Sequence, residues 1–138
     1  MSNLQLFIHH PDEIPLDLEV IERPLAHNEN AMPLRLVCRL PIPLESGQLV
    51  SIHTRDQIHC PNVTGQVDWC SPQRGGYELG ILFPDSEHAM RIRMFEQVCH
   101  IRRYRLYLEE HQGRFLSEDE AAMEWIARYA ALFPSNAL

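Results

Sequence analysis

The sequence predicts a mainly β domain that ends in two α-helices. Apolar and polar residues alternate in several segments before residue 85, which is typical of half-buried strands. From Ser86 to His111 the chain contains neither glycine nor proline, and its composition favours helix. A length of 138 residues fits one hydrophobic core. We therefore expect a single domain over 1–138, with strands in 1–85, a long helix over 86–112 and a short helix over 117–133.

Five short strands account for the first part of the chain. In the segment 34–40 apolar residues are interleaved with arginines, which puts one face of a strand in the core. Pro41 and Pro43 end this strand because proline donates no hydrogen bond to a sheet. Two further segments on either side of the turn SPQRGG form a hairpin. Strands at this spacing favour a small antiparallel barrel or sandwich. The predicted strands are 14–20, 34–40, 48–54, 63–70 and 77–83, with the hairpin turn over 71–76.

Capping residues predict where both helices begin. Asp85 or Ser86 can cap the start of the long helix, and Gly113 can end it in the left-handed conformation. Ser117 and Glu120 fit the capping box, in which each side chain bonds the backbone N–H of the other residue. The short helix therefore begins at Ser117 and runs towards the proline that stops it.

The long helix carries apolar residues on two opposite faces, whereas a helix that lies on a sheet needs one. On the second face, Met94, Ile101 and Leu108 are seven residues apart, which is the spacing of a coiled-coil seam. Two explanations remain open: the short helix covers this face within the chain, or a second chain covers it in a dimer. The first face comprises Ile92, Phe95, Cys99 and Leu106, and the second comprises Met90, Met94, Ile101, Tyr104 and Leu108.

The chain is acidic, with twelve basic residues against nineteen acidic ones and a net charge of −7. A surface that tracks nucleic-acid phosphates needs a positive excess, so this class of partner is excluded. Every basic residue is arginine, which also excludes a P-loop ATPase with its lysine. No run of eighteen apolar residues and no signal-peptide pattern occurs, so we expect a cytoplasmic protein that does not insert into a membrane. The four cysteines form no Cys-x-x-Cys pair and are expected to remain thiols there.

No residue pattern predicts catalysis or a metal centre. The sequence lacks the His-Glu-x-x-His and Cys-x-x-Cys spacings of metal sites, and its adjacent His and Cys residues point to different sides. It also lacks the Gly-x-Ser-x-Gly turn of a nucleophilic serine. We therefore expect neither an enzyme nor a bound cofactor or metal. The arginines of the long helix, among them Arg102 and Arg103, either pair with nearby carboxylates or present a surface to an acidic partner.

Three segments resemble the PilZ-domain family. The hairpin GQVDWCSPQRGGYELGILFPD looks like the last two barrel strands of that family, with a Gly-x-Val-x-Trp strand, a Gly-rich turn and a strand that ends in Gly-Ile-x-Phe. The tail MRIRMFEQVCHIRRYR and the later SEDEAAMEWIARYAALFP are similar to the C-terminal helices of a proteobacterial branch, and HHPDEIP resembles the start of its first strand. The resemblance implies a six-stranded β-barrel that acts as a receptor for the second messenger cyclic di-GMP.

The resemblance also implies where the nucleotide would bind. Family members use Arg-x-x-x-Arg before the first strand and Asp/Asn-x-Ser-x-x-Gly after it, because phosphates and guanine edges suit the planar fork of arginine. Gln5 and His9 stand in place of the two arginines. Asn30 matches the second motif, but Met32 and Arg35 replace its serine and glycine. A literal Arg-x-x-x-Arg, RLVCR, occurs within a predicted strand. The candidate nucleotide-binding residues are His9, Asn30, Arg35 and Arg39.

The function implied by the resemblance lies in cyclic di-GMP signalling, which serves motility, pilus assembly and biofilm formation. We expect a non-catalytic regulatory adaptor that contacts an unidentified protein partner or forms a homodimer through the long helix, and binds the nucleotide weakly or not at all. The alternative is a genuine receptor that holds cyclic di-GMP as its ligand in a non-standard site. The expected interaction residues are Met90, Met94, Ile101, Leu108, Arg102 and Arg103.

Overall fold

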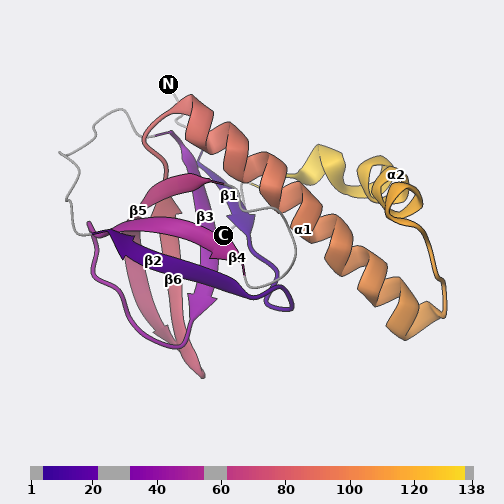
Figure 1. Cartoon of the computed structure of the whole chain (residues 1–138), viewed down its shortest axis with the longest axis horizontal. Helices are drawn as coiled ribbons and strands as arrows, with labels where there is room; N and C mark the ends of the chain where they lie inside the picture. Colours follow the sequence, from indigo (N-terminus) through magenta and orange to yellow (C-terminus); the bar gives the residue numbers. More distant parts are fainter. Residues whose placement is uncertain (1–4, 22–31, 55–61, 136–138) are drawn as a thin grey trace.

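The chain forms a mixed α/β structure in which a six-stranded sheet is followed by two helices (Figure 1). The computed structural model describes residues 5–21, 32–54 and 62–135. The strands are β1 (Leu6–His9), β2 (Leu16–Ile21), β3 (Leu34–Leu40), β4 (Leu49–Thr54), β5 (Val63–Gln73) and β6 (Gly76–Leu82). The helices are α1 (Ser86–Gln112) and α2 (Glu118–Tyr129), and α2 continues into a 3-10 helix, η1 (Ala130–Leu132).

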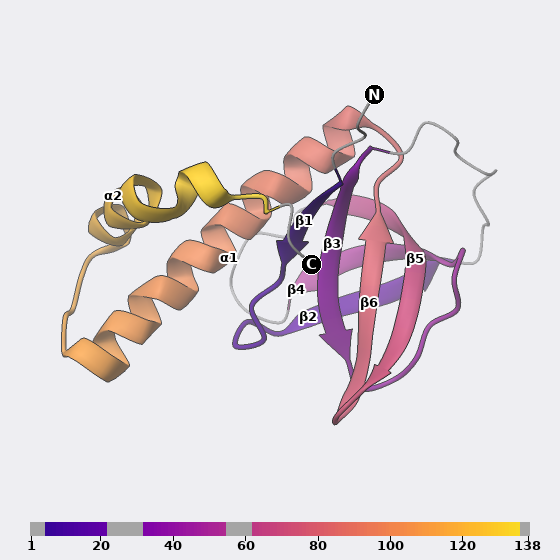
Figure 2. The same ribbon diagram turned by 180° about the vertical axis from the view of Figure 1, so that it is seen from behind.

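The strand order in the sheet is β1-β3-β6-β5-β4-β2. The pairs β3–β6, β6–β5, β5–β4 and β4–β2 are antiparallel, as the alternation and the hairpin predict. β1 pairs with β3 in parallel, so that Phe7 lies beside Arg35 and His9 beside Val37. Figure 2 shows β1, β3, β6 and β5 side by side, with β4 and β2 curving away behind them. The alternation in β3 points Leu36 and Cys38 into the core.

The sheet is open, so the prediction of a closed antiparallel barrel is wrong. β1 and β2 are its two edges, and no pairing joins them among the residues that the structure describes. The outer edge of β1 is already occupied by the segment that follows α2. Phe7 donates to Ser135 with a donor–acceptor distance of 2.6 Å, and Ser135 donates back over 2.9 Å. This exchange satisfies backbone groups that β2 would need to close a barrel.

Two local predictions about the strands also need correction. The hairpin turn is shorter than the predicted 71–76, because β5 continues to Gln73 and Gly75 takes a φ of +84° in the tight turn before β6. The ladder between β5 and β6 shifts register between Val67 and Trp69. β1 was not among the five predicted strands because its apolar residues do not alternate. Ile8 enters the core while Phe7, on the other face, contacts the Trp69 ring.

The core lies between one face of the sheet and the N-terminal half of α1. Ile92, Phe95 and Cys99 belong to the same buried cluster as Ile8 and Leu36, which confirms most of the predicted first face of the helix. Leu106 was predicted on that face and is 40% exposed instead. The reason is visible in Figures 1 and 2, where the C-terminal half of α1 extends beyond the sheet.

The predicted helix caps are confirmed. Asp85 accepts a hydrogen bond from the His88 backbone over 2.8 Å, and Gly113 ends α1 with a φ of +60°. Ser117 and Glu120 form both bonds of the capping box, 3.1 and 3.0 Å long. The short helix was predicted to reach residue 133, but its α-helical part ends at Tyr129. In the described part of the chain, neither helix offers an apolar stretch long enough to cross a bilayer.

α2 covers the C-terminal half of the second apolar face of α1. Tyr104 and Leu108 of α1 are buried together with Trp125 of α2, and Ile101 packs against this cluster. A polar contact reinforces the packing, since Tyr104 donates to Glu124 of α2 over 2.6 Å. For this half of the face, the first of the two explanations is confirmed: the short helix covers it within the chain.

Candidate functional site

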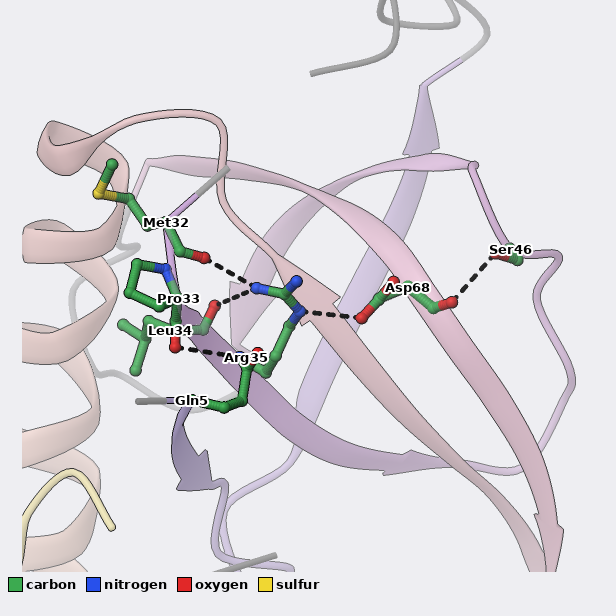
Figure 3. Close-up of polar contacts among 7 residues, drawn as sticks. All are labelled: Gln5, Met32, Pro33, Leu34, Arg35, Ser46 and Asp68. Carbon is green, nitrogen blue, oxygen red and sulfur yellow. Dashed lines mark hydrogen bonds and ion pairs between the residues drawn. The ribbon is translucent and has the colours of Figure 1, made fainter. Parts of the chain in front are cut away.

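Arg35 lies on the outer face of the sheet, where its guanidinium group donates hydrogen bonds to a carboxylate and to two backbone carbonyls. Its Nε donates to the Asp68 carboxylate over 2.9 Å (Figure 3). Its Nη1 donates to the backbone carbonyls of Met32 and Leu34 over 2.8 and 3.2 Å. The side chain is 15% exposed. Three hydrogen bonds, one of them to a carboxylate, therefore hold the guanidinium flat against the sheet.

The partners of Arg35 are themselves held in place. Ser46, in the loop before β4, donates to the backbone carbonyl of Asp68 over 3.0 Å, close to the register shift in β5 (Figure 3). Gln5 donates its side-chain amide to the carbonyl of Pro33 over 3.0 Å. Gln5 stands where the sequence resemblance to the PilZ-domain family would place the first arginine, and here it ties the start of β1 to the start of β3.

Arg39 points to the same face of β3 but lies at the other end of the strand. It donates to the carbonyl of Arg74 in the β5–β6 turn over 2.6 Å and lies 3.9 Å from the Asp12 carboxylate. Its side chain is 46% exposed. Four residues along a strand separate the two Cα atoms of Arg35 and Arg39 by about 13 Å. The literal Arg-x-x-x-Arg is therefore two separate contacts and not one clasp for a phosphate.

The structure describes one of the other two candidate nucleotide residues. His9 is exposed at the end of β1, beside Val37 of β3, and lines a cavity beneath α2. Asn30 lies outside the described residues. Val37 lies between Arg35 and Arg39 on β3, so His9 is next to the strand position that separates the two arginines.

The predicted interaction residues of α1 divide into two groups. Met90 and Met94 are exposed by 57% and 60%, while Leu108 is almost completely buried beneath α2 and cannot contact a partner. Ile101 is partly buried against the same cluster. The predicted seam of Met94, Ile101 and Leu108 is thus wrong as one continuous docking surface, because α2 occupies its C-terminal part. Of the two predicted arginines, Arg102 lies 3.8 Å from Glu118 of α2, and Arg103 is exposed.

A buried polar pair that the sequence analysis missed joins the β1–β2 connection to α1. His10 Nδ1 and Glu96 Oε2 are 2.7 Å apart, and His10 Nε2 donates to the Ile14 carbonyl over 2.6 Å. Glu96 is fully buried and His10 nearly so. The signal for Glu96 was its place within the apolar face of α1, between Ile92 and Cys99. Its partner could not be predicted from a local sequence pattern, because His10 and Glu96 are 86 positions apart.

Burial and the mutual hydrogen bond have opposite effects on the pKa values of His10 and Glu96. Burial lowers the pKa of His10, but the hydrogen bond and negative charge of Glu96 outweigh it and raise that pKa above its usual value. Burial raises the pKa of Glu96, although the bond to His10 works in the opposite direction. The pair therefore retains its shared proton more firmly than either residue would in water.

A cavity of about 600 Å³ is lined by residues of β1, α1, α2 and the segment that follows α2. Aromatic residues line much of it, including Trp125, Tyr129 and Phe133, and His9 and His100 contribute nitrogen atoms. The ring centroids of His100 and Phe133 are 5.0 Å apart. Burial, with a smaller contribution from the charge of Arg103, lowers the pKa of His100 to about 4. His100 is therefore neutral at physiological pH.

Comparison with known proteins yields no relative. No family model matches the chain, and no curated protein or solved structure matches it either.

Proposed function

We propose that this chain is a non-catalytic regulatory adaptor of the PilZ type, which acts in the cytoplasm by contact with another protein. One observation carries the proposal: the Arg35 guanidinium is engaged by Asp68 and by two backbone carbonyls. The resemblance in the β5–β6 hairpin and the C-terminal helices supports the family. The engagement of Arg35 supports a member that binds cyclic di-GMP weakly or not at all.

A nucleotide phosphate would have to compete with the bonds that Arg35 already makes. A hydrogen bond to a charged group contributes about 1.5–3 kcal/mol. Displacing Asp68 therefore offsets most of what a new phosphate contact at Arg35 could add. Arg39 lies at the other end of β3 and is bonded to the carbonyl of Arg74 instead. Gln5 and His9, which replace the arginines of the family motif, offer no guanidinium near the start of β1.

The exposed N-terminal half of α1 is the surface on which we place the protein contact. Met90 and Met94 lie one turn apart and present flexible, apolar side chains to solvent. Val98 follows one turn later and is also exposed. Arg91 lies beside this stripe and is paired with Glu87. An apolar stripe with a paired charge at its border resembles the centre and rim of a protein interface.

Calorimetric titration with cyclic di-GMP tests the nucleotide side of the proposal. With protein at about 100 µM, we expect no binding heat, because the bonds that already hold Arg35 leave the nucleotide with an affinity weaker than this concentration. The Asp68→Ala variant, which releases Arg35, is the informative comparison and should bind at least as well as the wild type. Micromolar binding by the wild type that is lost in Arg35→Ala would instead identify a receptor with a non-standard site.

Sedimentation tests the protein contact. The double variant Met90→Glu/Met94→Glu is compared with Met123→Glu, which makes one such substitution on the exposed face of α2. If the stripe joins two copies of this chain, the double variant sediments as a smaller species than the wild type and than Met123→Glu. If all three sediment as monomers, self-association is excluded and the stripe remains a surface for a different protein.

A further inference from the structure

Three potential metal ligands meet in the core, where the β1–β2 connection touches α1. One ligand atom from each of His10, Glu96 and Cys99 lies within 4.8 Å of the other two. All three residues are buried. Glu96 and Cys99 are three residues apart on α1 and therefore project from the same side of the helix. His10 reaches them from a part of the chain that is far away in sequence.

The carboxylate of Glu96 is not satisfied by the bonds it makes. Its Oε2 faces His10, but its Oε1 is buried and has no hydrogen-bond partner among the described residues. His100 Nε2 lies 3.9 Å from Oε1, which is too far for a hydrogen bond. An unsatisfied buried carboxylate oxygen costs free energy unless a cation or a donor joins it.

The Nδ1 atom of His10 is oriented so that it can bind a metal ion. Its Nε2–H donates to the Ile14 carbonyl over 2.6 Å, which fixes the ring and leaves Nδ1 directed at Glu96. A histidine that binds a metal through one nitrogen usually donates the other N–H to a carbonyl or carboxylate in this way. The second contact that such a ligand requires is therefore already present.

We propose that His10, Glu96 and Cys99 form a buried binding site for a divalent transition metal ion, with Zn²⁺ as the best fit. Imidazole nitrogen, carboxylate oxygen and thiolate sulfur are the three ligand types that Zn²⁺ takes in proteins. Ligand atoms on one tetrahedral Zn²⁺ lie about 3.3–3.8 Å apart, given metal–ligand bonds of about 2.0–2.3 Å. The 2.7 Å contact between His10 and Glu96 must therefore open by about 1 Å when the ion enters. A small rotation of the Glu96 side chain provides this.

The charges and protons of the site balance. Without metal, the His10–Glu96 pair shares one proton and the Cys99 thiol holds another, so the group is neutral as a whole. When Zn²⁺ binds, both protons leave, and the two charges of the ion are matched by one carboxylate and one thiolate. The buried site is neutral in both states, which avoids the large cost of a net charge in the core. His100 Nε2 or a water molecule completes the fourth position.

The ion would fasten the β1–β2 connection to α1 in place of a single hydrogen bond. Because His10 follows β1 and the other two ligands lie on α1, binding links the start of the sheet to the helix that carries the exposed methionines. This inference does not rest on the proposed adaptor function, and either can fail without the other.

Binding of Co²⁺, followed by its absorption spectrum, tests the site directly. The full chain is unfolded, stripped of metal and refolded with one equivalent of Co²⁺, so that slow entry into the core cannot hide binding. We expect tetrahedral Co²⁺ bands together with a thiolate charge-transfer band. Cys99→Ser should lose the charge-transfer band, while Cys38→Ser and Cys70→Ser, which change the other described cysteines, should keep it.

A second readout separates loss of the site from loss of the fold. Glu96→Gln keeps the shape of the side chain and should weaken Co²⁺ and Zn²⁺ binding by at least about tenfold. Zn²⁺ should raise the thermal midpoint of the wild type and leave that of Cys99→Ser unchanged. A thiolate band that persists in Cys99→Ser, or affinities that are equal in the wild type and in both variants, would overturn the proposal.

Discussion

The substitution His10→Leu should destabilise the protein strongly, because it leaves Glu96 buried without a partner. His10 Nδ1 and Glu96 Oε2 are 2.7 Å apart, and the Glu96 side chain has no exposed surface. Removing one member of a buried ion pair costs about 3–5 kcal/mol, whereas replacing both members by apolar residues is often neutral. We therefore expect His10→Leu to lower the free energy of unfolding by about 3–5 kcal/mol at neutral pH. His10→Leu/Glu96→Leu should recover to within about 1–2 kcal/mol of the wild type.

The cost of His10→Leu should also depend on pH. Without its partner, Glu96 avoids a buried charge by taking up a proton, and one pKa unit corresponds to about 1.4 kcal/mol. At about pH 5 the variant should therefore recover roughly 1–3 kcal/mol relative to neutral pH. In the wild type, the pKa values of His10 and Glu96 both lie above their ordinary values of 6.5 and 4.5. The stability that His10 contributes is therefore full below pH 6.5 and is lost as the pH rises through its folded pKa. The raised pKa of Glu96 acts in the same direction, so the stability of the fold also decreases as the pH rises above 4.5.

Urea unfolding monitored by circular dichroism measures these differences, with a chelator present so that no metal contributes. His9→Leu is the matched control, since it makes the same change one residue earlier at an exposed side chain. It should change the unfolding free energy by less than about 0.5 kcal/mol. The reasoning is refuted if His10→Leu costs less than about 1 kcal/mol, or if the double variant loses the sum of the two single losses.

Three further predictions concern packing and pH. Leu108→Ala should lower the free energy of unfolding by about 2–5 kcal/mol, because the side chain is buried beneath α2. Leu106→Ala, at an exposed position, should cost far less. Equal losses of the two variants in urea titrations would contradict this packing. Gly80→Ala should lower the thermal midpoint, since the added Cβ would lie 2.3 Å from atoms of the Trp69 ring, and an unchanged midpoint would mean that this ring lies elsewhere. The pKa of His100 is lowered to about 4 in the folded protein, whereas in the unfolded chain this residue takes up a proton near pH 6.5. The free energy of unfolding therefore decreases as the pH falls from 6.5 towards 4. His100→Gln should remove about 3 kcal/mol of that acid-induced loss, and a pH profile of unfolding that matches the wild type would refute the assignment.

Local signals predicted the helices well because the residues that end a helix are its near neighbours in sequence. Asp85, Gly113 and the Ser117–Glu120 capping box each act within one turn, and the structure has all of them. Alternation likewise identified β3 with its full bounds. It missed β1 because this strand is short and its first three residues, Leu6, Phe7 and Ile8, form one apolar run without alternation.

The arrangement of the sheet edges and of the candidate site depends on contacts between distant segments. The open sheet follows from the bonds between Phe7 and Ser135, which no local pattern encodes. Arg35 was correctly placed on the outer face of a strand, but its partner Asp68 is 33 residues away and sits at a register shift. The burial of Glu96 could be predicted from its place on an apolar helix face, whereas nothing local in the sequence predicts that His10 is its partner.

A side-chain NMR titration tests the central claim most directly, since the Nε–H signal of Arg35 reports the bond to Asp68. In the absence of nucleotide we expect a slowly exchanging Arg35 signal that Asp68→Ala makes exchange faster, while the Nε–H of the exposed Arg103 serves as the internal reference. The account predicts that cyclic di-GMP, added to millimolar concentration, leaves the Arg35 and Arg39 signals where they are. A saturable shift of both signals would show that the dinucleotide displaces Asp68, and would contradict an adaptor that works without it.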